Sequence, residues 1–151
     1  MFFNYDNFEK FIKAGYTTGQ GSKYFKIGPL KLIADGSLGA RTAYMQEPYS
    51  DDNTTNGILT LNEEQLEKFI KIAKSKNMQL AIHTIGDGAA KIAVNLINKY
   101  NKNLLNSMRD GIVHAQILNL EILQEMKKGK VTAYIQPVFI DTDMEIVEKR
   151  I

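Results

Sequence analysis

The chain contains two histidines, His83 and His114, and each follows a short apolar run. His83 lies in the stretch LAIHTIGDGAA, and His114 lies in GIVHAQIL. Neutral imidazole is a standard zinc ligand and also a common general acid or base. A lone histidine at such a place more often fills a polar position at a strand end. The residue types by themselves therefore leave a core role and a metal-binding role open.

The segments around the two histidines are predicted to form neighbouring strand-helix units. Short apolar runs at 78–84 and 110–115 have the length of strands, and residues 86–100 between them have the periodicity of an amphipathic helix. Parallel strands of an α/β protein bind ligands at their carboxyl ends. Both imidazoles are therefore expected on the same edge of the sheet, which is the arrangement that a shared divalent metal ion needs.

The rest of the sequence continues this alternation, apart from one long polar segment at 36–60. A loop of that length in a compact domain is usually functional or a linker. Periodicity and capping signals predict strands at 25–35 and 130–137 and helices at 5–16, 61–77, 119–129 and 141–151, with Asn62 and Asp87 as N-caps and Gly129 as a C-cap. This pattern predicts an α/β fold with parallel strands and right-handed crossovers.

Two polar residues of the predicted strand 25–35 are candidates for chemistry. Asp35 ends the strand and is expected on the same edge as the histidines, although an Asp-Gly turn also accounts for it. Lys31 lies inside the strand, where an exposed face is the simpler interpretation. If it is buried instead, its amine has a depressed pKa and can react with carbon dioxide to give a metal-binding carbamate.

Asp35 and two further residues are candidates for contacts with a substrate. Arg41 lies in the long polar segment and could meet an anionic or polar group. Gln136 ends the last predicted strand, just before Pro137, and is expected to face the same edge of the sheet.

Composition excludes several classes of function. The length of 151 residues is that of one domain, and a net charge of +2 with scattered lysines gives no sign of a nucleic-acid partner. The absence of cysteine excludes disulfides and cysteine-based metal sites. No apolar run approaches the roughly 18 residues needed to cross a membrane. The N-terminal sequence lacks the pattern of a signal peptide, so a cytoplasmic location is expected.

Four stretches together resemble the amidohydrolase superfamily, and within it amidohydrolase family 3, which includes N-substituted formamide deformylase-like enzymes. They are LKLIADGSLGARTAYMQEPYSDD, LAIHTIGDGAA, GIVHAQIL and VTAYIQP, and the resemblance extends over roughly residues 10–145. The resemblance implies a metal-dependent hydrolase on a (β/α)8 barrel. It matches His83 and His114 to the metal ligands of the fifth and sixth strands, and Lys31 to the fourth-strand position, where a carboxylated lysine would bind metal.

Two parts of the family pattern have no counterpart in the sequence. It contains no His-x-His pair, and no strand is predicted after the IQP strand to carry the eighth-strand aspartate that serves as general acid and base. A whole barrel typically needs about 250 residues. We therefore expect residues 1–151 to form a single partial barrel domain of about four parallel strands alternating with helices, a fragment of a larger amidohydrolase.

The resemblance implies that the chain is part of a metal-dependent amidohydrolase. In such an enzyme, a metal-activated water would cleave amide or formamide-type C–N bonds other than peptide bonds. It implies a divalent metal, with zinc expected, and a small-molecule amide substrate; the isolated chain is expected to be inactive. Because the inner face of a partial barrel is bare, self-association is also expected. The alternatives are a non-enzymatic α/β module that binds a small ligand, or a structural fragment.

Overall fold

The computed structural model describes residues 3–4, 7–101 and 106–151 of the chain. Within them, one sheet of five strands has the order β1-β2-β3-β4-β5, and every neighbouring pair is parallel. The strands are β1 (Phe3–Asn4), β2 (Leu30–Ile33), β3 (Leu80–Thr84), β4 (Gly111–His114) and β5 (Thr132–Tyr134). The helices are α1 (Phe8–Lys13), α2 (Glu63–Ser75), α3 (Asp87–Tyr100), α4 (Leu120–Gly129) and α5 (Ile140–Arg150), with a 3-10 turn η3 at Pro137–Phe139 before α5.

The predicted alternation of four parallel strands with helices is confirmed, and β1 adds a fifth strand at the edge. The strands follow one another across the sheet in chain order, as they do in part of a barrel and not in a doubly wound sheet. The predicted strand 25–35 is shorter than expected, because regular pairing covers only Leu30–Ile33.

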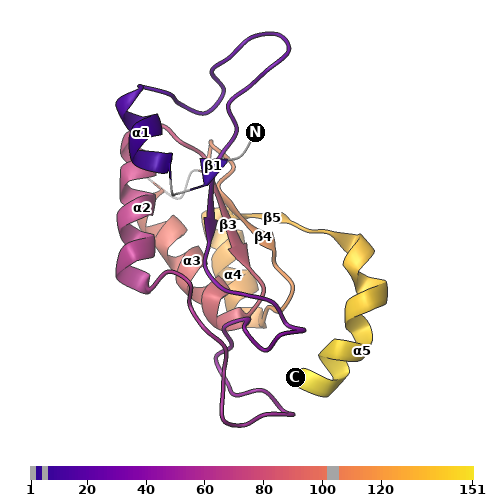
Figure 1. The fold of residues 1–151 in the computed structure, drawn as a ribbon. Coiled ribbons are helices and arrows are strands. Elements are labelled where there is room, and N and C mark those ends of the chain that lie inside the picture. The colour runs from indigo at the N-terminus through magenta and orange to yellow at the C-terminus, as the bar shows by residue number, and fades with distance from the viewer. Residues whose placement is uncertain (1–2, 5–6, 102–105) are drawn as a thin grey trace.

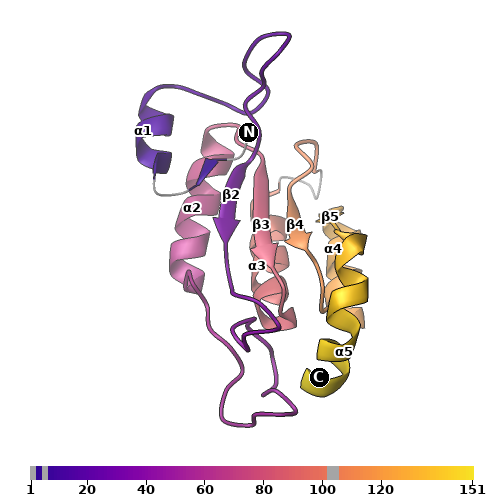
Figure 2. The same cartoon turned by 45° about the vertical axis from the view of Figure 1, so that its right-hand side comes forward.

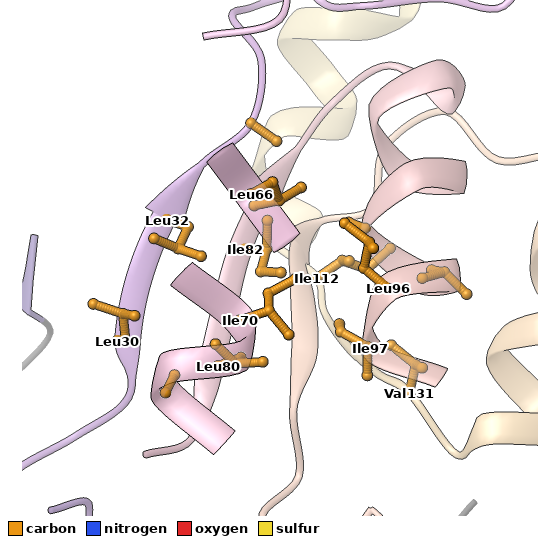
Figure 3. Packing of buried hydrophobic residues seen from close by; sticks show 14 of the residues in the cluster. Leu30, Leu32, Leu66, Ile70, Leu80, Ile82, Leu96, Ile97, Ile112 and Val131 are labelled. Carbon is orange, nitrogen blue, oxygen red and sulfur yellow. The ribbon is translucent and has the colours of Figure 1, made fainter. Parts of the chain in front are cut away.

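The hydrophobic core lies between one face of the sheet and the helices. Leu80 and Ile82 of β3 and Ile112 of β4 are fully buried there. Figure 3 shows their side chains turned toward those of α2 and α3, among them Leu66, Ile70, Leu96 and Ile97. Since side chains alternate along a strand, the residues between them project from the opposite face.

That opposite face borders a hollow of about 430 Å³. It is lined by Lys31, Ala81, Val113, His114, Tyr134, Ile135 and Gln136. Figure 1 shows α1 and α2 on one side of the strands and α5 on the other side. The sheet therefore has a packed face toward the helices and a more open face that carries the candidate residues.

The helix ends confirm one predicted cap and correct two. Asn62 caps α2 in a capping box with Gln65. The N-cap of α3 is Gly86; the Asp87 carboxylate instead accepts hydrogen bonds from the backbone and side chain of Gln46. The C-cap of α4 is Lys130 with φ 53°, and Gly129 is the last helical residue. A Cβ at Gly129 would meet the side-chain amide of Asn98, which would have to move.

The polar segment 36–60 packs against the carboxyl end of the sheet. Leu38, Ala43 and Tyr49 form a second buried cluster with Ile85, and Ile146 and Val147 of α5 pack on it. Figure 2 shows this segment running below the strands to the end of α5. In the part of the chain that the structure describes, no helix is long and apolar enough to cross a membrane.

Candidate metal centre at the carboxyl edge of the sheet

The two histidine rings meet at the carboxyl edge, with centroids 4.7 Å apart and planes at 72°. In the β3–β4 register, His83 lies opposite Val113, and His114 lies opposite Thr84. Regular alternation would therefore send the two imidazoles to opposite faces of the sheet. His114 and the following Ala115 instead have φ 73° and 49°, so the backbone turns where the strand ends.

This turn brings the His114 ring against His83. A non-glycine residue in the left-handed region costs on the order of 1–3 kcal/mol, and such residues cluster at functional sites. Ala115 N donates to Thr84 O at 3.2 Å, which helps to hold the turn. The juxtaposition of the rings thus depends on a strained backbone and not on strand periodicity.

The hydrogen bonds of His83 leave one of its ring nitrogens available. Nε2 lies 2.9 Å from the carbonyl oxygen of Gly36, which can only accept, so Nε2 carries the proton. Nδ1 of the neutral ring then keeps its lone pair, as a metal ligand requires. Burial lowers the pKa of His114, and His83 and Lys31 lower it further while Asp143 opposes them, so its ring also favours the neutral form.

Asp35 is enclosed at the same edge. It is 1% exposed, and its carboxylate accepts hydrogen bonds from the backbone N–H groups of Tyr44, Ile85 and Gly86. Burial raises the pKa of Asp35, while these three hydrogen bonds and His83 oppose the rise. Asp35 thus lies at the edge where the sequence predicted it, and it joins the turn after β3 to the segment 36–60.

Lys31 is half-buried, unlike in the exposed interpretation of the sequence, and it lines the hollow with His114 and Gln136. Burial lowers the pKa of its amine, which favours the neutral and more nucleophilic form. Gln136 is exposed and also lines a second hollow, of about 230 Å³, beside His114. Lys31, His114 and Gln136 therefore share one open space.

Arg41 lies apart from this group. Its guanidinium binds both carboxylate oxygens of Asp51, at 2.9 and 2.7 Å, and it lines neither hollow beside His114. Sequence reasoning missed two participants. The backbone carbonyl of Gly36 carries no sequence signal, and Phe139, whose ring lies 6.3 Å from that of His114, follows the last strand in a short apolar run.

The side chains present fit part of a metal site. Two imidazoles and a half-buried amine are nitrogen donors suited to zinc and similar ions. Across residues 3–4, 7–101 and 106–151, no group of three or more His, Cys, Asp and Glu side chains comes together in a way that could hold a metal ion. The donor set in this chain is therefore incomplete.

A singly wound parallel sheet with two imidazoles at one carboxyl edge is the arrangement of a (β/α) barrel enzyme with a site at its rim. Residues 4–151 match the amidohydrolase family, and the chain belongs to that family. The resemblance seen in the sequence is thereby confirmed.

Two curated relatives cover most of the chain. It is 37% identical over 128 residues to YtcJ of Bacillus subtilis (strain 168), a protein named as an amidohydrolase, with 85% of this chain and 24% of YtcJ aligned. It is 29% identical over 131 residues to LONG AFTER FAR-RED 3 of Arabidopsis thaliana, covering 86% of this chain and 22% of that protein. The chain spans about a quarter of the length of these relatives.

Two solved structures share the fold over nearly the whole chain. An uncharacterized metal-dependent hydrolase from Pyrococcus furiosus superposes with a TM-score of 0.85 at 32% identity, covering 98% of this chain and 30% of that one. A second uncharacterized metal-dependent hydrolase, from Pyrococcus horikoshii OT3, gives 0.86 at 34% identity, covering 98% and 29%.

Proposed function

We propose that this chain supplies part of the metal centre of a metal-dependent amidohydrolase. The observation that carries the proposal is the approach of the His83 and His114 rings to 4.7 Å through a left-handed turn of the backbone. The metal-dependent hydrolases with the same fold support a divalent ion in this place. His83 and His114 would hold it, and Lys31, as a free amine or a carbamate, would add a further ligand.

The proposed metal is zinc, because two neutral imidazoles suit it. When bound, such an ion polarises a carbonyl group and makes a water molecule a stronger nucleophile at neutral pH. The protein's own residues have other tasks. The Gly36 carbonyl holds the proton of His83 on Nε2, and burial lowers the pKa of His114, which favours its neutral ring.

The proposed substrate is a small molecule with an amide or formamide-type C–N bond other than a peptide bond. The Gln136 amide is placed to donate or accept a hydrogen bond beside His114, and Phe139 and Ile135 offer apolar contact in the same hollow. Asp35 is enclosed and Arg41 is paired with Asp51, so we assign neither to direct contact with the substrate.

The isolated chain is proposed to bind metal weakly and to turn over no substrate. The sequence contains no His-x-His pair, so the described ligand set stops at two histidines and Lys31. Neither described carboxylate near the histidines is free to act as general acid and base. Asp35 is buried and occupied by backbone N–H groups, and Asp143, whose charge acts on His114, accepts a hydrogen bond from the Gln116 amide.

Self-association through the open face is part of the proposal. Ile33 and Ile135 are 40% and 63% exposed, on the strand that neighbours β3 and just after β5. A second copy covering this face would remove them from water. Light scattering at increasing concentration should show a species larger than the monomer, and a stable monomer throughout would contradict it.

Calorimetric titration of the metal-free chain with zinc tests the metal site. We expect binding of one ion per chain, weakened at least about tenfold by His83→Ala or His114→Ala, because each removes a donor. Glu125→Gln, on the outer surface of α4, is the matched control and should bind zinc as the unmodified chain does. Equal zinc affinity in all four proteins would refute the proposed centre.

A further inference from the structure

The turn after β2 contains Asp35 and Gly36, and it connects His83 to the segment that follows β3 and to the segment 36–60. Asp35 and Gly36 follow the last residues of β2, and both contact the end of β3. Asp35 does so with its side chain, while Gly36 does so with its backbone carbonyl. Neither contact belongs to the ladder between the strands.

The Asp35 carboxylate joins two segments that are distant in sequence. Its Oδ2 accepts from Tyr44 N at 3.1 Å and from Gly86 N at 2.8 Å, and its Oδ1 accepts from Ile85 N at 3.0 Å. With the side chain 0% exposed, the carboxylate has no water shell to compete for these bonds. Its position is therefore fixed by three donors from two sides.

The same carboxylate lies beside the His83 ring. Oδ1 is 3.4 Å from His83 Nε2, the nitrogen that donates to Gly36 O. A negative oxygen next to Nε2 favours the tautomer that places the proton there. Asp35 thus acts on the ring directly through its charge and indirectly by fixing the turn that carries the Gly36 carbonyl.

We propose that Asp35 is a positioning residue that holds His83 in the Nε2–H tautomer and in the orientation that leaves Nδ1 free. Asp35 contacts neither the metal nor the substrate. The consequence for metal affinity rests on the proposed function, whereas the tautomer and the ring orientation are properties of the metal-free chain.

The nitrogen-15 NMR shifts of the imidazoles, measured on the metal-free chain at alkaline pH, test the tautomer directly. In the unmodified chain we expect His83 to be protonated almost entirely on Nε2. Asp35→Asn keeps the shape, but one oxygen becomes an NH2 group. The amide nitrogen fits best at the Oδ1 position, since Ile85 N also lies within 3.2 Å of Oδ2. There it faces His83 Nε2 as a donor and should raise the Nδ1–H population severalfold.

Asp110→Asn is the matched control. Asp110 is also a fully buried aspartate that accepts a backbone N–H of β3, but from Leu80 at the other end of the strand. It should leave the His83 tautomer unchanged. An unmodified chain with His83 protonated on Nδ1, equal spectra for Asp35→Asn and the unmodified chain, or an equal change in Asp110→Asn would each overturn the proposal. The first of these needs no variant to fold.

Zinc titration of the same proteins separates the two proposals. Asp35→Asn is expected to weaken zinc binding about tenfold, in the range found for residues that orient a ligating histidine. Suppose that the unmodified chain binds no zinc but shows the Nε2–H tautomer, and that Asp35→Asn changes this tautomer. The proposed metal centre is then wrong, and the positioning role of Asp35 is supported. If zinc binds but the tautomer does not respond to Asp35, the reverse holds.

Discussion

The two ends of strand β3 are each held by a buried aspartate, yet the two environments differ. At the amino end, Asp110 accepts Leu80 N at 2.8 Å and pairs with Lys74 Nζ at 2.5 Å. At the carboxyl end, Asp35 accepts backbone N–H groups and approaches His83, and no lysine or arginine of the described residues pairs with it. One carboxylate is neutralised by a cation, and the other is not.

The amino end carries a network of hydrogen bonds beside the Asp110–Lys74 pair. The Gln79 side-chain amide donates to Arg109 O and to Tyr134 Oη, and Tyr134 Oη donates to Arg109 O. The Asn106 amide donates to Asp110 O. These bonds connect β3, β4 and β5 where the strands begin. Left-handed backbone occurs here as well, at Arg109 with φ 58°, but Arg109 precedes β4, whereas His114 belongs to that strand. This end is arranged for stability.

The carboxyl end carries features that reduce stability. His114 has a left-handed backbone, and Lys31 is a half-buried amine with a lowered pKa. Burial raises the pKa of Asp35. In (β/α) barrels the carboxyl end of the strands carries the site, and functional sites commonly retain such strain. The comparison teaches that the two ends of one strand are held differently. A buried ion pair holds the amino end, whereas the carboxyl end is held by a carboxylate that accepts backbone N–H groups beside two histidines.

The largest effect is expected from Lys74→Met at the amino end. The substitution leaves the Asp110 carboxylate, which is 0% exposed, without its cation. Removing one partner of a buried ion pair destabilises by about 3–5 kcal/mol. Urea denaturation should show this loss in the free energy of unfolding, and zinc affinity should be unchanged under conditions where the chain stays folded.

Lys99→Met is the control for this prediction. Lys99 pairs with Glu67 at 2.5 Å, but the Lys99 side chain is 59% exposed, so water compensates for the lost partner. Its midpoint in urea should differ little from that of the unmodified chain. Equal losses in the two variants would mean that burial does not distinguish the amino-end pair.

A smaller effect is expected from Gly86→Ala at the carboxyl end. A Cβ on Gly86 would collide with the backbone of Tyr44, which itself donates to Asp35. Overpacking of this kind costs about 1–3 kcal/mol. The collision also pushes the 36–60 segment away from β3, so zinc affinity should fall together with stability, unlike in Lys74→Met.

Gly39→Ala, in the segment 36–60, tests whether the effect of Gly86→Ala depends on where the methyl group is added. Its nearest neighbour would be Ile146 Cδ1 at 3.9 Å, an ordinary contact. Thermal unfolding and zinc titration should both match the unmodified chain. If Gly39→Ala weakened zinc binding as much as Gly86→Ala, the close approach at Gly86 would not be the cause.

Sequence patterns could predict the sheet, because the spacing of apolar residues along the chain distinguishes strands from amphipathic helices. Ile82 and Ile112 alternate toward the helices as expected, and Asn62 caps α2. The position of His83 at a strand end followed from the same reasoning. These features depend on neighbours that are close in the sequence.

The details of the site could not be predicted in the same way, because they depend on contacts between distant segments. Asp35 reads as an Asp-Gly turn until Ile85 and Gly86 are seen to donate to it, 50 and 51 residues further along the chain. Asp87 reads as an N-cap until Gln46 is seen to occupy its carboxylate. The left-handed backbone of His114 could not be predicted from the residue type. Histidine is enriched in that region, but His83 is also a histidine and keeps a regular strand backbone.

The smallest effect is expected from Lys31→Met on the open face. Methionine has a similar length and no charge to desolvate, so we expect a gain of about 0.5–1 kcal/mol in the free energy of unfolding, as when a functional polar group is replaced by an apolar one. Zinc binding should weaken, because one donor is lost.

Lys71→Met, at an exposed position of α2, separates this gain from a general effect of removing a positive charge. Its stability should stay within about 0.5 kcal/mol of the unmodified chain. A loss of stability in Lys31→Met would show that the amine stabilises the open face. The carboxyl end would then contribute to stability, as the amino end does, and the contrast between the two ends would be weaker. A gain with weaker zinc binding would place Lys31 with His114 among the groups kept for function at the carboxyl edge.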